Sequence, residues 1–327
     1  MGEFDLIDRY FKRPATRNVL GHDQSARVAL GVGDDCALLQ PAPGMQLAVS
    51  CDMLVEGRHF LSTVSPARLG HKALAVNLSD LAACGARPVG FTLALAMPRV
   101  DERFLEGFAR GLLALADEHD CELIGGDTTQ GPLNLCITVF GELPAGEALL
   151  RSGAQPGDDL YVSGTLGDAR AALEVFRGCL SVDGVAFEAL RRAMEQPQPR
   201  VALGQALRGV ATSAIDVSDG LLGDLGHILR RSQLGATLEV DALPCSTVLR
   251  TLPVSLQREF TLAGGDDYEL VFSAPPARAA AVTRAAEASG VGITRIGRLH
   301  AEPGLRLVDA NGLAVANGFG SFDHFKS

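Results

Sequence analysis

Lysine is scarce in this sequence: of the 29 basic residues only three, Lys12, Lys72 and Lys326, are lysines. A phosphotransferase of the P-loop type needs a lysine at the end of a G-x-x-x-x-G-K-[ST] motif, and that motif does not occur. The protein-kinase signature motifs, the H-E-x-x-H zinc motif and the G-x-S-x-G elbow of serine hydrolases are missing as well. These familiar catalytic classes are therefore excluded.

Paired cysteines are also absent. The seven cysteines are dispersed, and no two of them form a C-x-x-C motif. An odd number of scattered cysteines argues against a disulfide framework and favours reduced, mostly buried thiols. We therefore expect a cytoplasmic protein.

Excess positive charge and long apolar segments are lacking too. The formal net charge is -10, which argues against a nucleic acid as partner. No run reaches the ~18 apolar residues of a membrane span, and we expect no membrane partner. Residues 1–5 show neither the basic flank nor the apolar core of a signal peptide.

The residues that are present predict a well-packed protein of two domains. The chain has 327 residues, 47% of them hydrophobic, which is enough for about two cores. Prolines and glycines gather between Leu143 and Asp158, so we expect one domain over 1–145 and another over 146–327. Strand-like and long helix-like segments alternate, which predicts an α/β or α+β fold with mixed sheets covered by helices.

Several elements are predicted from local signals. Ser65-Pro66 begins a helix that runs to about Cys84 and buries the stripe Leu74, Leu78 and Leu81. Asp101 caps a helix over about 102–119. Asn311-Gly312 predicts a hairpin.

Short acidic motifs recur beside small residues or at the ends of apolar segments. The five motifs are Gly33-Asp34-Asp35, Ser50-Cys51-Asp52, Asn77-Leu78-Ser79-Asp80, Gly125-Gly126-Asp127-Thr128-Thr129 and Asp216-Val217-Ser218-Asp219-Gly220. The second lies at the end of a strand predicted over about 46–51, so that Asp52 follows the strand, and the fourth is predicted as a turn between strands at 121–124 and 134–142. Singly, each acid is an ordinary turn or cap residue.

Taken together, the acidic motifs predict a cation site. None of them contains a lysine or arginine, and neighbouring carboxylates repel each other unless a cation lies between them. If the motifs converge, Mg²⁺ is the natural ligand, and Mg²⁺ held this way commonly bridges nucleotide phosphates. The loop Gly164-Thr165-Leu166-Gly167 before a predicted helix has two interpretations, an anion site at the helix N-terminus or a tight turn.

The ordered series of motifs resembles the thiamine-monophosphate kinase family from Glu3 to Phe325. Besides the acidic motifs, the segments that carry this resemblance are Asp52-Met53-Leu54-Val55-Glu56-Gly57, Arg151-Ser152-Gly153-Ala154 and Gly264-Gly265-Asp266-Asp267-Tyr268-Glu269-Leu270. The resemblance implies the fold of the aminoimidazole-ribonucleotide-synthetase superfamily, with two α/β domains and amino-terminal sheets that pair across a homodimer. It also implies transfer of the ATP γ-phosphoryl group to thiamine monophosphate.

The same resemblance implies roles for individual residues. The implied Mg²⁺ ligands are Asp35, Ser50, Asp52, Asp80, Asp127, Asp216 and Asp219; the implied ATP contacts are Gly126, Arg151 and Ser218; the implied substrate contacts are His59, Asp266 and Phe319. Asp127, Asp219 and Arg151 are expected to matter most for phosphoryl transfer.

Three positions depart from the family's pattern. Asp266 stands where glutamate is frequent, Phe319 where tryptophan or tyrosine is frequent, and Cys51 where threonine is common. The first two changes keep a carboxylate and an aromatic face, which suit the thiazolium cation. Phe319 has a second interpretation, as an apolar anchor of the carboxy-terminal tail.

Other functions are weighed against this one. A selenophosphate synthetase should carry a reactive Cys near the amino terminus, but Cys36 is the first here. The hydrogenase-maturation relative should end in a cysteine, whereas this chain ends in Lys326-Ser327. Aminoimidazole-ribonucleotide synthetase agrees less well with the motifs. A noncatalytic sensor of Mg-nucleotide or thiamine phosphate is the alternative from another class.

Overall fold

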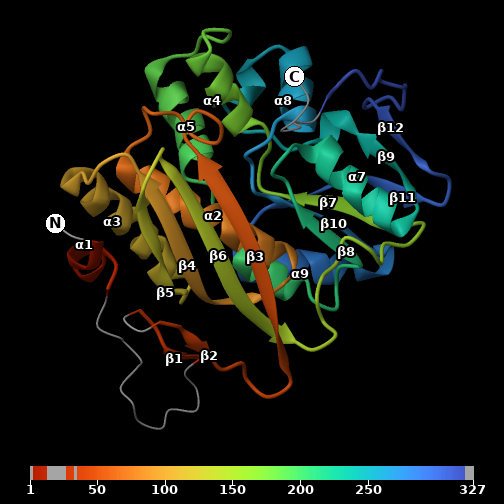
Figure 1. The fold of residues 1–327 in the computed structure, drawn as a ribbon. Helices are drawn as coiled ribbons and strands as arrows, with labels where there is room; N and C mark the ends of the chain where they lie inside the picture. The colour runs from red at the N-terminus through yellow and green to blue at the C-terminus, as the bar shows by residue number, and fades with distance from the viewer. Residues whose placement is uncertain (1–2, 13–26, 33–34, 321–327) are drawn as a thin grey trace. The chain divides into compact units, whose positions relative to one another are not determined.

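The computed structural model describes residues 3–12, 27–32 and 35–320, and its described chain divides into two compact units (Figure 1). Unit 1 comprises the chain up to Leu81 together with Ala86–Gly146. Unit 2 comprises Ala82–Gly85 and the chain from Glu147 onward. Each unit has its own mixed sheet with helices packed on it, so the predicted fold class is confirmed.

Unit 1 is built on a four-stranded sheet in the order β3-β6-β4-β5. Its elements are α1 (Glu3–Tyr10), β1 (Val28–Leu30), β2 (Leu38–Leu39), β3 (Met45–Val55), α2 (Pro66–Ala83), β4 (Arg87–Met97), α3 (Glu102–Glu118), β5 (Glu122–Gln130) and β6 (Asn134–Pro144). Strands β4 and β5 are parallel, and the other neighbours in this sheet are antiparallel.

Helices α2 and α3 cover one face of this sheet (Figure 1). The predicted stripe of α2 is buried, because Leu74 and Leu78 are 0% exposed and Leu81 is 1% exposed. The two helices approach closely at Gly111, where an added Cβ would lie 1.8 Å from the carbonyl oxygen of Ala67. The predicted helix starts are confirmed, since Ser65 Oγ accepts the N–H of residue 68 and Asp101 accepts two N–H groups of α3.

Two predicted strand ends are wrong. Residues 125–129 are not a turn, because strand β5 continues through them in parallel pairing with β4. Asp52 does not follow a strand, because β3 pairs with β6 from Met45 to Val55. Pairing between distant strands supplies hydrogen bonds that outweigh the local preference of Gly and Asp for turns.

Unit 2 is built on a six-stranded sheet in the order β12-β9-β11-β7-β10-β8. Its strands are β7 (Asp159–Ser163), β8 (Ser213–Asp216), β9 (Gly235–Glu239), β10 (Leu270–Ala274), β11 (Ile293–His300) and β12 (Gly304–Val308). Its helices are α4 (Asp168–Phe176), α5 (Gly184–Glu195), α6 (Val201–Ala206), α7 (Leu221–Ser232), α8 (Val254–Ala263) and α9 (Ala279–Ser289), with short 3-10 turns η1 (Val240–Ala242), η2 (Leu249–Thr251) and η3 (Pro276–Arg278).

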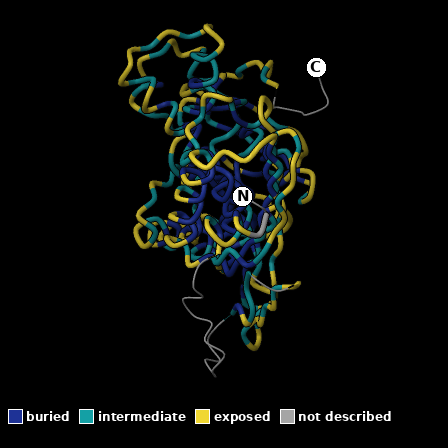
Figure 2. The backbone as a smooth tube through the Cα atoms, turned by 60° about the vertical axis from the view of Figure 1, so that its left-hand side comes forward, coloured by how far each residue is buried: buried dark blue, intermediate teal, exposed yellow. Residues whose placement is uncertain are grey.

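The core of unit 2 lies between its sheet and helix α7. Leu225 and Ile228 of α7 are fully buried with Val162 and Val271 of the sheet. Strands β7, β8 and β10 are buried along their whole length, and Figure 2 shows the contrast between such buried segments in dark blue and the exposed ones in yellow. The loops before and after β8 are therefore attached to a strand that is held in place by packing.

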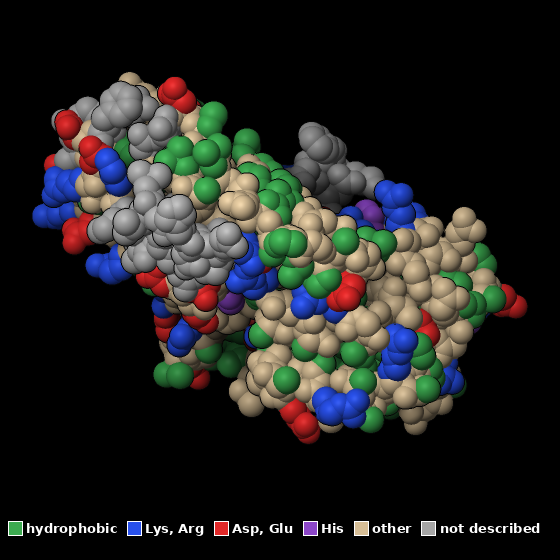
Figure 3. All heavy atoms as spheres, turned by 90° about the horizontal axis from the view of Figure 1, so that it is seen from below, with side chains coloured by type: hydrophobic (Ala, Val, Ile, Leu, Met, Phe, Trp, Pro, Cys, Tyr) green, Lys and Arg blue, Asp and Glu red, His purple; other side chains and the backbone are tan. Residues whose placement is uncertain are grey.

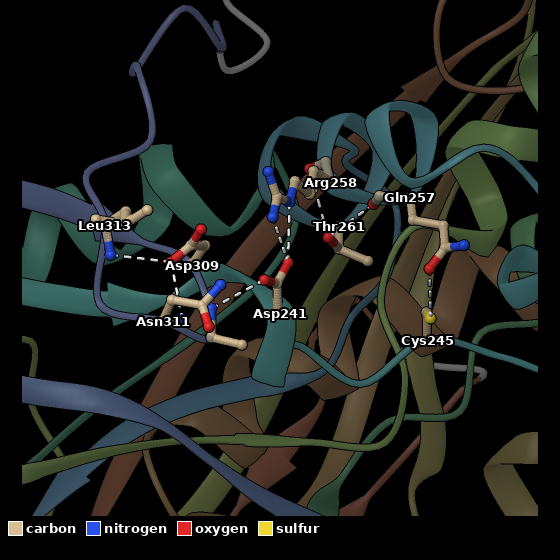
Figure 4. Close-up of polar contacts among 9 residues, drawn as sticks. Asp241, Cys245, Gln257, Arg258, Thr261, Asp309, Asn311 and Leu313 are labelled. Atoms are coloured by element: carbon tan, nitrogen blue, oxygen red, sulfur yellow. Dashed lines mark hydrogen bonds and ion pairs between the residues drawn. The ribbon is translucent and has the colours of Figure 1, made fainter.

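The predicted hairpin at Asn311-Gly312 is present near the carboxy terminus. Asp309 accepts the N–H groups of Asn311 and Leu313, both at 2.9 Å (Figure 4). Asp241 accepts the N–H of Ala310 at 3.0 Å and pairs with Arg258 of α8 at 2.7 Å. The hairpin is thereby tied to the rest of unit 2.

Candidate functional site

The two units carry separate parts of the predicted site. Asp35, Ser50, Asp52, His59, Asp80, Gly126 and Asp127 lie in unit 1, and Arg151, Asp216, Ser218, Asp219, Asp266 and Phe319 lie in unit 2. Asp34 of the first motif lies outside the described residues.

Two of the predicted metal ligands, Ser50 and Asp80, meet where helix α2 lies beside strand β3, and a third, Asp52, lies two residues further along this strand. Ser50 Oγ donates a hydrogen bond to the Asp80 carboxylate. The N–H of Asp52 points out of the sheet edge and donates to Oδ1 of Asn77 at 3.0 Å. Asn77 in turn donates to the carbonyl of Ala73 at 3.0 Å, so its amide is fixed. Asn77 and Asp80, which are three residues apart in α2, thus lie on the helix face that contacts β3.

Asp127 lies at the opposite edge of the same sheet. Asp127 lies on β5, and strands β6 and β4 lie between β5 and β3. The distance between β3 and β5 is therefore three interstrand spacings, or roughly 14 Å. Asp127 pairs with Ala94, and this row continues to Cys136 and Met53. Since paired residues project to the same face, Asp127 lies on the open face, whereas Asp52 pairs with Ile137 in the helix-covered row.

The remaining residues of unit 1 have local partners. Nδ1 of His59 accepts the N–H of Val55 at 3.0 Å in the turn after β3. Asp35 is exposed in the bend between β1 and β2.

Across the described ranges 3–12, 27–32 and 35–320, no three His, Cys, Asp or Glu side chains are grouped as a metal site would require. The assignment of these acids to Mg²⁺ stays a prediction.

In unit 2 the predicted nucleotide and substrate loops lie side by side. Asp216 ends strand β8 and is buried, and the turn with Ser218 and Asp219 leads from it into helix α7. The N–H of Asp266 donates to the carbonyl of Ser218 at 2.8 Å. The N–H of Tyr268 donates to the carbonyl of Val217, also at 2.8 Å. The fold therefore joins two motifs that are almost 50 residues apart in the sequence.

A buried carboxylate supports this turn from the other side. Asp224, in the first turn of α7 and 4% exposed, accepts the N–H groups of Ser218 and Asp219, both at 3.1 Å. Burial raises the pKa of Asp224 to about 7 despite these hydrogen bonds, and the charge of Asp219 adds to the increase. Sequence reasoning missed Asp224, although an acid in the first turn of a helix is a recognised signal.

Arg151 contacts the carboxy-terminal end of helix α7. Its carbonyl accepts a hydrogen bond from Ser232 at the end of the helix, at 3.4 Å. The pKa of His227 is lowered by burial and by the charges of Arg230 and Arg151, and the charge of Asp219 opposes this change. Arg151 and Asp219 are therefore both within electrostatic reach of His227.

The loop Gly164–Gly167 is a strand-to-helix turn whose helix end already holds a carboxylate. The N–H of Gly167 donates to both oxygens of Asp267, at 2.9 and 3.0 Å. Burial raises the pKa of Asp267, which the hydrogen bond from Gly167 only partly offsets. Of the two interpretations of this loop, the structure favours the turn.

Phe319 packs as a partly buried side chain against the main core of unit 2, together with Leu305 and Val315. This contact agrees with its interpretation as an anchor of the tail. Its contact with a substrate stays a prediction. The tail beyond residue 320 lies outside the described residues.

Comparison with known proteins gives matches in both units. Residues 33–143 match the family described as AIR synthase related protein, N-terminal domain, and residues 155–310 match its C-terminal domain. Thiamine-monophosphate kinase of Salmonella typhimurium is 47% identical over 328 residues, which cover 99% of this chain and 98% of that protein.

Solved structures are similar over most of the chain. The crystal structure of thiamine-monophosphate kinase from Stenotrophomonas maltophilia K279a superposes with a TM-score of 0.83 at 46% identity, covering 89% of this chain and 93% of that one. A structure described as AaThiL complexed with AMPPCP and TMP gives a TM-score of 0.77 at 28% identity, covering 88% and 89%.

Proposed function

This chain belongs to the thiamine-monophosphate kinase family, and we propose that it transfers the γ-phosphoryl group of ATP directly, in line, to the phosphate of thiamine monophosphate, giving thiamine diphosphate and ADP. The observation that carries this function is 47% identity over 99% of the chain to a thiamine-monophosphate kinase. A relative with the same fold was solved with AMPPCP, an ATP analogue, and TMP. The alternative activities of the superfamily considered above are not supported by an identity of this size.

The two units have different tasks in this proposal. Residues 1–145 carry most Mg-ATP ligands and the dimer interface, and residues 146–327 contribute to the nucleotide and substrate sites. The role of residues 146–327 is supported by two neighbouring loops of unit 2. One loop carries Ser218, an expected ATP contact, and the other carries Asp266, an expected substrate contact, and the two residues share a backbone hydrogen bond.

The residues along β3 and α2 fit a hard divalent cation. Ser50 and Asp80 already share a hydrogen bond, and Asp52 lies two residues from Ser50 on the same face of the strand. Hydroxyl and carboxylate oxygens are the ligands that Mg²⁺ prefers. Bound there, Mg²⁺ would supply positive charge against the phosphates of ATP.

The chain's own residues then have to position two anions. The second pKa of a phosphate monoester is about 6, so the acceptor oxygen is largely ionised at neutral pH and needs no strong general base. The rate enhancement then comes from orienting the two phosphates in line and from compensating their negative charge. In this proposal Arg151 would donate hydrogen bonds to a phosphate, and Gly126 and Ser218 would be further contacts of ATP. Asp266 and Phe319 would contact the thiazolium ring of the substrate, and His59 is a further expected substrate contact.

The open face of the unit 1 sheet is the proposed dimer interface. Val49 and Met53 of β3 are 58% and 54% exposed, and Leu47 is 42% exposed. Hydrophobic side chains gather near the top of Figure 3. Sγ of Cys51 lies 3.4 Å from Sγ of Cys136 on this face, between these apolar residues. A row of exposed apolar side chains along one strand is typical of an interface between subunits.

None of the helices in the described chain has the length and apolar character that crossing a bilayer requires. We propose a cytoplasmic enzyme, because the seven cysteines are dispersed in the sequence and form no paired-cysteine motif.

One assay tests the function. ADP production is measured with ATP and Mg²⁺, with and without thiamine monophosphate, for the wild type and for the variants Asp127→Asn and Asp219→Asn. We expect ADP only when thiamine monophosphate is present. We expect turnover in each variant to fall by about 10²-fold or more, because each loses an expected carboxylate ligand of the Mg²⁺ that would compensate the phosphate charge.

The matched control is Asp8→Asn, which removes an exposed carboxylate that pairs with Lys12 on α1. This control should keep the wild-type rate, since exposed pairs contribute little. Circular dichroism checks that all variants fold. Wild-type rates in both Asp127→Asn and Asp219→Asn would contradict the site assignment. Ligand binding without ADP release would instead favour the noncatalytic sensor.

A further inference from the structure

The loop between helix α8 and strand β10 has an unusual backbone. Among the described residues, four that are not glycine have φ in the left-handed region, namely Asp120, Gln233, Asp266 and Tyr268. Asp120 and Gln233 follow the helices α3 and α7, where a left-handed residue commonly ends a helix. Asp266 (φ 67°) and Tyr268 (φ 51°) instead lie two residues apart in one loop.

A left-handed conformation is unfavourable for a side chain as large as tyrosine, so the surrounding structure must impose it. The neighbouring turn provides the constraint, because the carbonyls of Val217 and Ser218 accept the N–H groups of Tyr268 and Asp266, both at 2.8 Å. Gly265 lies so close to this turn that an added Cβ would be 2.5 Å from the Ser218 carbonyl oxygen. Strain of this kind is concentrated at functional sites.

The strained backbone brings two side chains of the loop together. The phenolic O–H of Tyr268 donates a hydrogen bond to Oδ1 of Asp266 at 3.0 Å. The Tyr268 residue is only 8% exposed, so its ring is held by packing, whereas Asp266 is half-buried. A fixed phenol therefore sets the direction of a carboxylate that remains accessible.

We propose that Tyr268 is a positioning residue for substrate recognition: it orients the Asp266 carboxylate toward the thiazolium cation of thiamine monophosphate. This inference rests on the proposed function, in which Asp266 contacts the substrate. Thiazolium carries its charge on a ring without an N–H donor, so a carboxylate can recognise it only through distance and direction. A hydrogen bond that fixes the carboxylate supplies that direction.

The test is the variant Tyr268→Phe, which removes one oxygen atom and keeps the ring. We expect KM for thiamine monophosphate to rise roughly tenfold, because the free energy of a hydrogen bond to a charged group corresponds to about a tenfold change in affinity. KM for ATP should stay at the wild-type value. The control is Tyr161→Phe, since Tyr161 is a similarly buried tyrosine, 7% exposed, that stacks on Phe272 in the sheet of the same unit. This control should leave both constants unchanged.

A double-mutant cycle with Asp266→Asn separates the possible failures. If Tyr268 acts through Asp266, adding Tyr268→Phe to Asp266→Asn should change KM for thiamine monophosphate no further. An effect of Asp266→Asn without any effect of Tyr268→Phe would overturn the role of Tyr268 and leave the proposed function intact. No effect of Asp266→Asn on this KM would overturn the inference and the substrate role of Asp266 together.

The kinetics are measured well below the melting temperature of each variant, so that a loss of folded enzyme does not contribute to the measured constants. Equal increases in KM for ATP and for thiamine monophosphate in Tyr268→Phe would show a structural role in the Ser218 turn, and would overturn the inference.

Discussion

At the scale of single residues, buried carboxylates define the loops of unit 2. Asp224 holds the N–H groups of Ser218 and Asp219, and Asp267 holds the N–H of Gly167. Both groups have a raised pKa because burial disfavours their charged form. Asp267 binds the N-cap residue of α4, a position that could otherwise attract an external anion, and Asp224 binds the turn that precedes α7. These acids therefore shape the loops beside the proposed site without being expected ligands themselves.

The raised pKa of Asp224 makes a testable contribution to the pH dependence of stability. Its pKa is about 7 in the folded state and 3.8 in the reference state, so the native protein binds this proton more tightly. Between these values the free energy of unfolding falls as pH rises, because the native state binds more protons than the unfolded state. Asp224→Asn removes this titration.

We expect the stability difference between Asp224→Asn and wild type to shift in favour of the variant by up to roughly 4 kcal/mol from about pH 4 to about pH 7.5, at ~1.4 kcal/mol per pKa unit. Urea unfolding of both proteins across this range measures the shift. Parallel curves for the two proteins would show that the pKa of Asp224 is not raised.

At the scale of elements, strand β5 shows why a glycine motif was mistaken for a turn. Gly125 and Gly126 have turn-like composition, but β5 pairs with β4 through both of them. Glycine is required at position 126 by close approach, since a Cβ there would lie 1.9 Å from the carbonyl oxygen of Leu93. Helix starts were predicted correctly because capping depends on residues a few positions apart. Strand ends depend on partners that local sequence does not specify.

Gly126→Ala should accordingly destabilise the protein by about 3 kcal/mol or more, because β4 and β5 must separate to admit the methyl group. Thermal unfolding followed by circular dichroism measures the loss. Gly131→Ala is the control, since a Cβ there would meet the nearest atom, Cβ of Ala96, at an ordinary 3.6 Å. Similar melting temperatures for the two variants would refute the packing explanation.

At the scale of the whole molecule, the proposed dimer gives a function to the open face of unit 1. Alternate residues of β3 are exposed along this face, and Asp127 lies on the same face at the far strand. Pairing of this face with a second copy would bury the apolar residues and bring new groups near Asp127. The proposed homodimer is therefore linked to the proposed metal site.

We expect Val49→Asp to convert the dimer into a monomer, since it places a charge in the middle of the apolar face, where burial of an unpaired carboxylate is costly. Light scattering coupled to size-exclusion chromatography measures the mass. Val185→Asp is the control, because Val185 of α5 is 84% exposed and no interface is proposed there. A wild-type monomer, or a dimer that persists in Val49→Asp, would contradict the proposed interface.

The sequence alone determined the fold class and the family, and it predicts the chemical type of the site. Helices α2 and α3, with their caps and buried stripes, follow from signals within a few residues, and the acidic motifs follow from composition and order. Resemblance of motifs then supplied the activity, and the identity to thiamine-monophosphate kinases supports it over the whole chain. These properties are encoded locally or in motif order, so one sequence suffices to find them.

Tertiary structure decided which of these residues are neighbours. It joined Ser50 to Asp80, left Asp127 across the sheet, and set Asp266 against Ser218. It also showed that Tyr268 and Asp224 support residues that the sequence had singled out. Such contacts depend on strand register and on the burial of groups far apart in the chain, and neither is specified by the residues on either side of a motif.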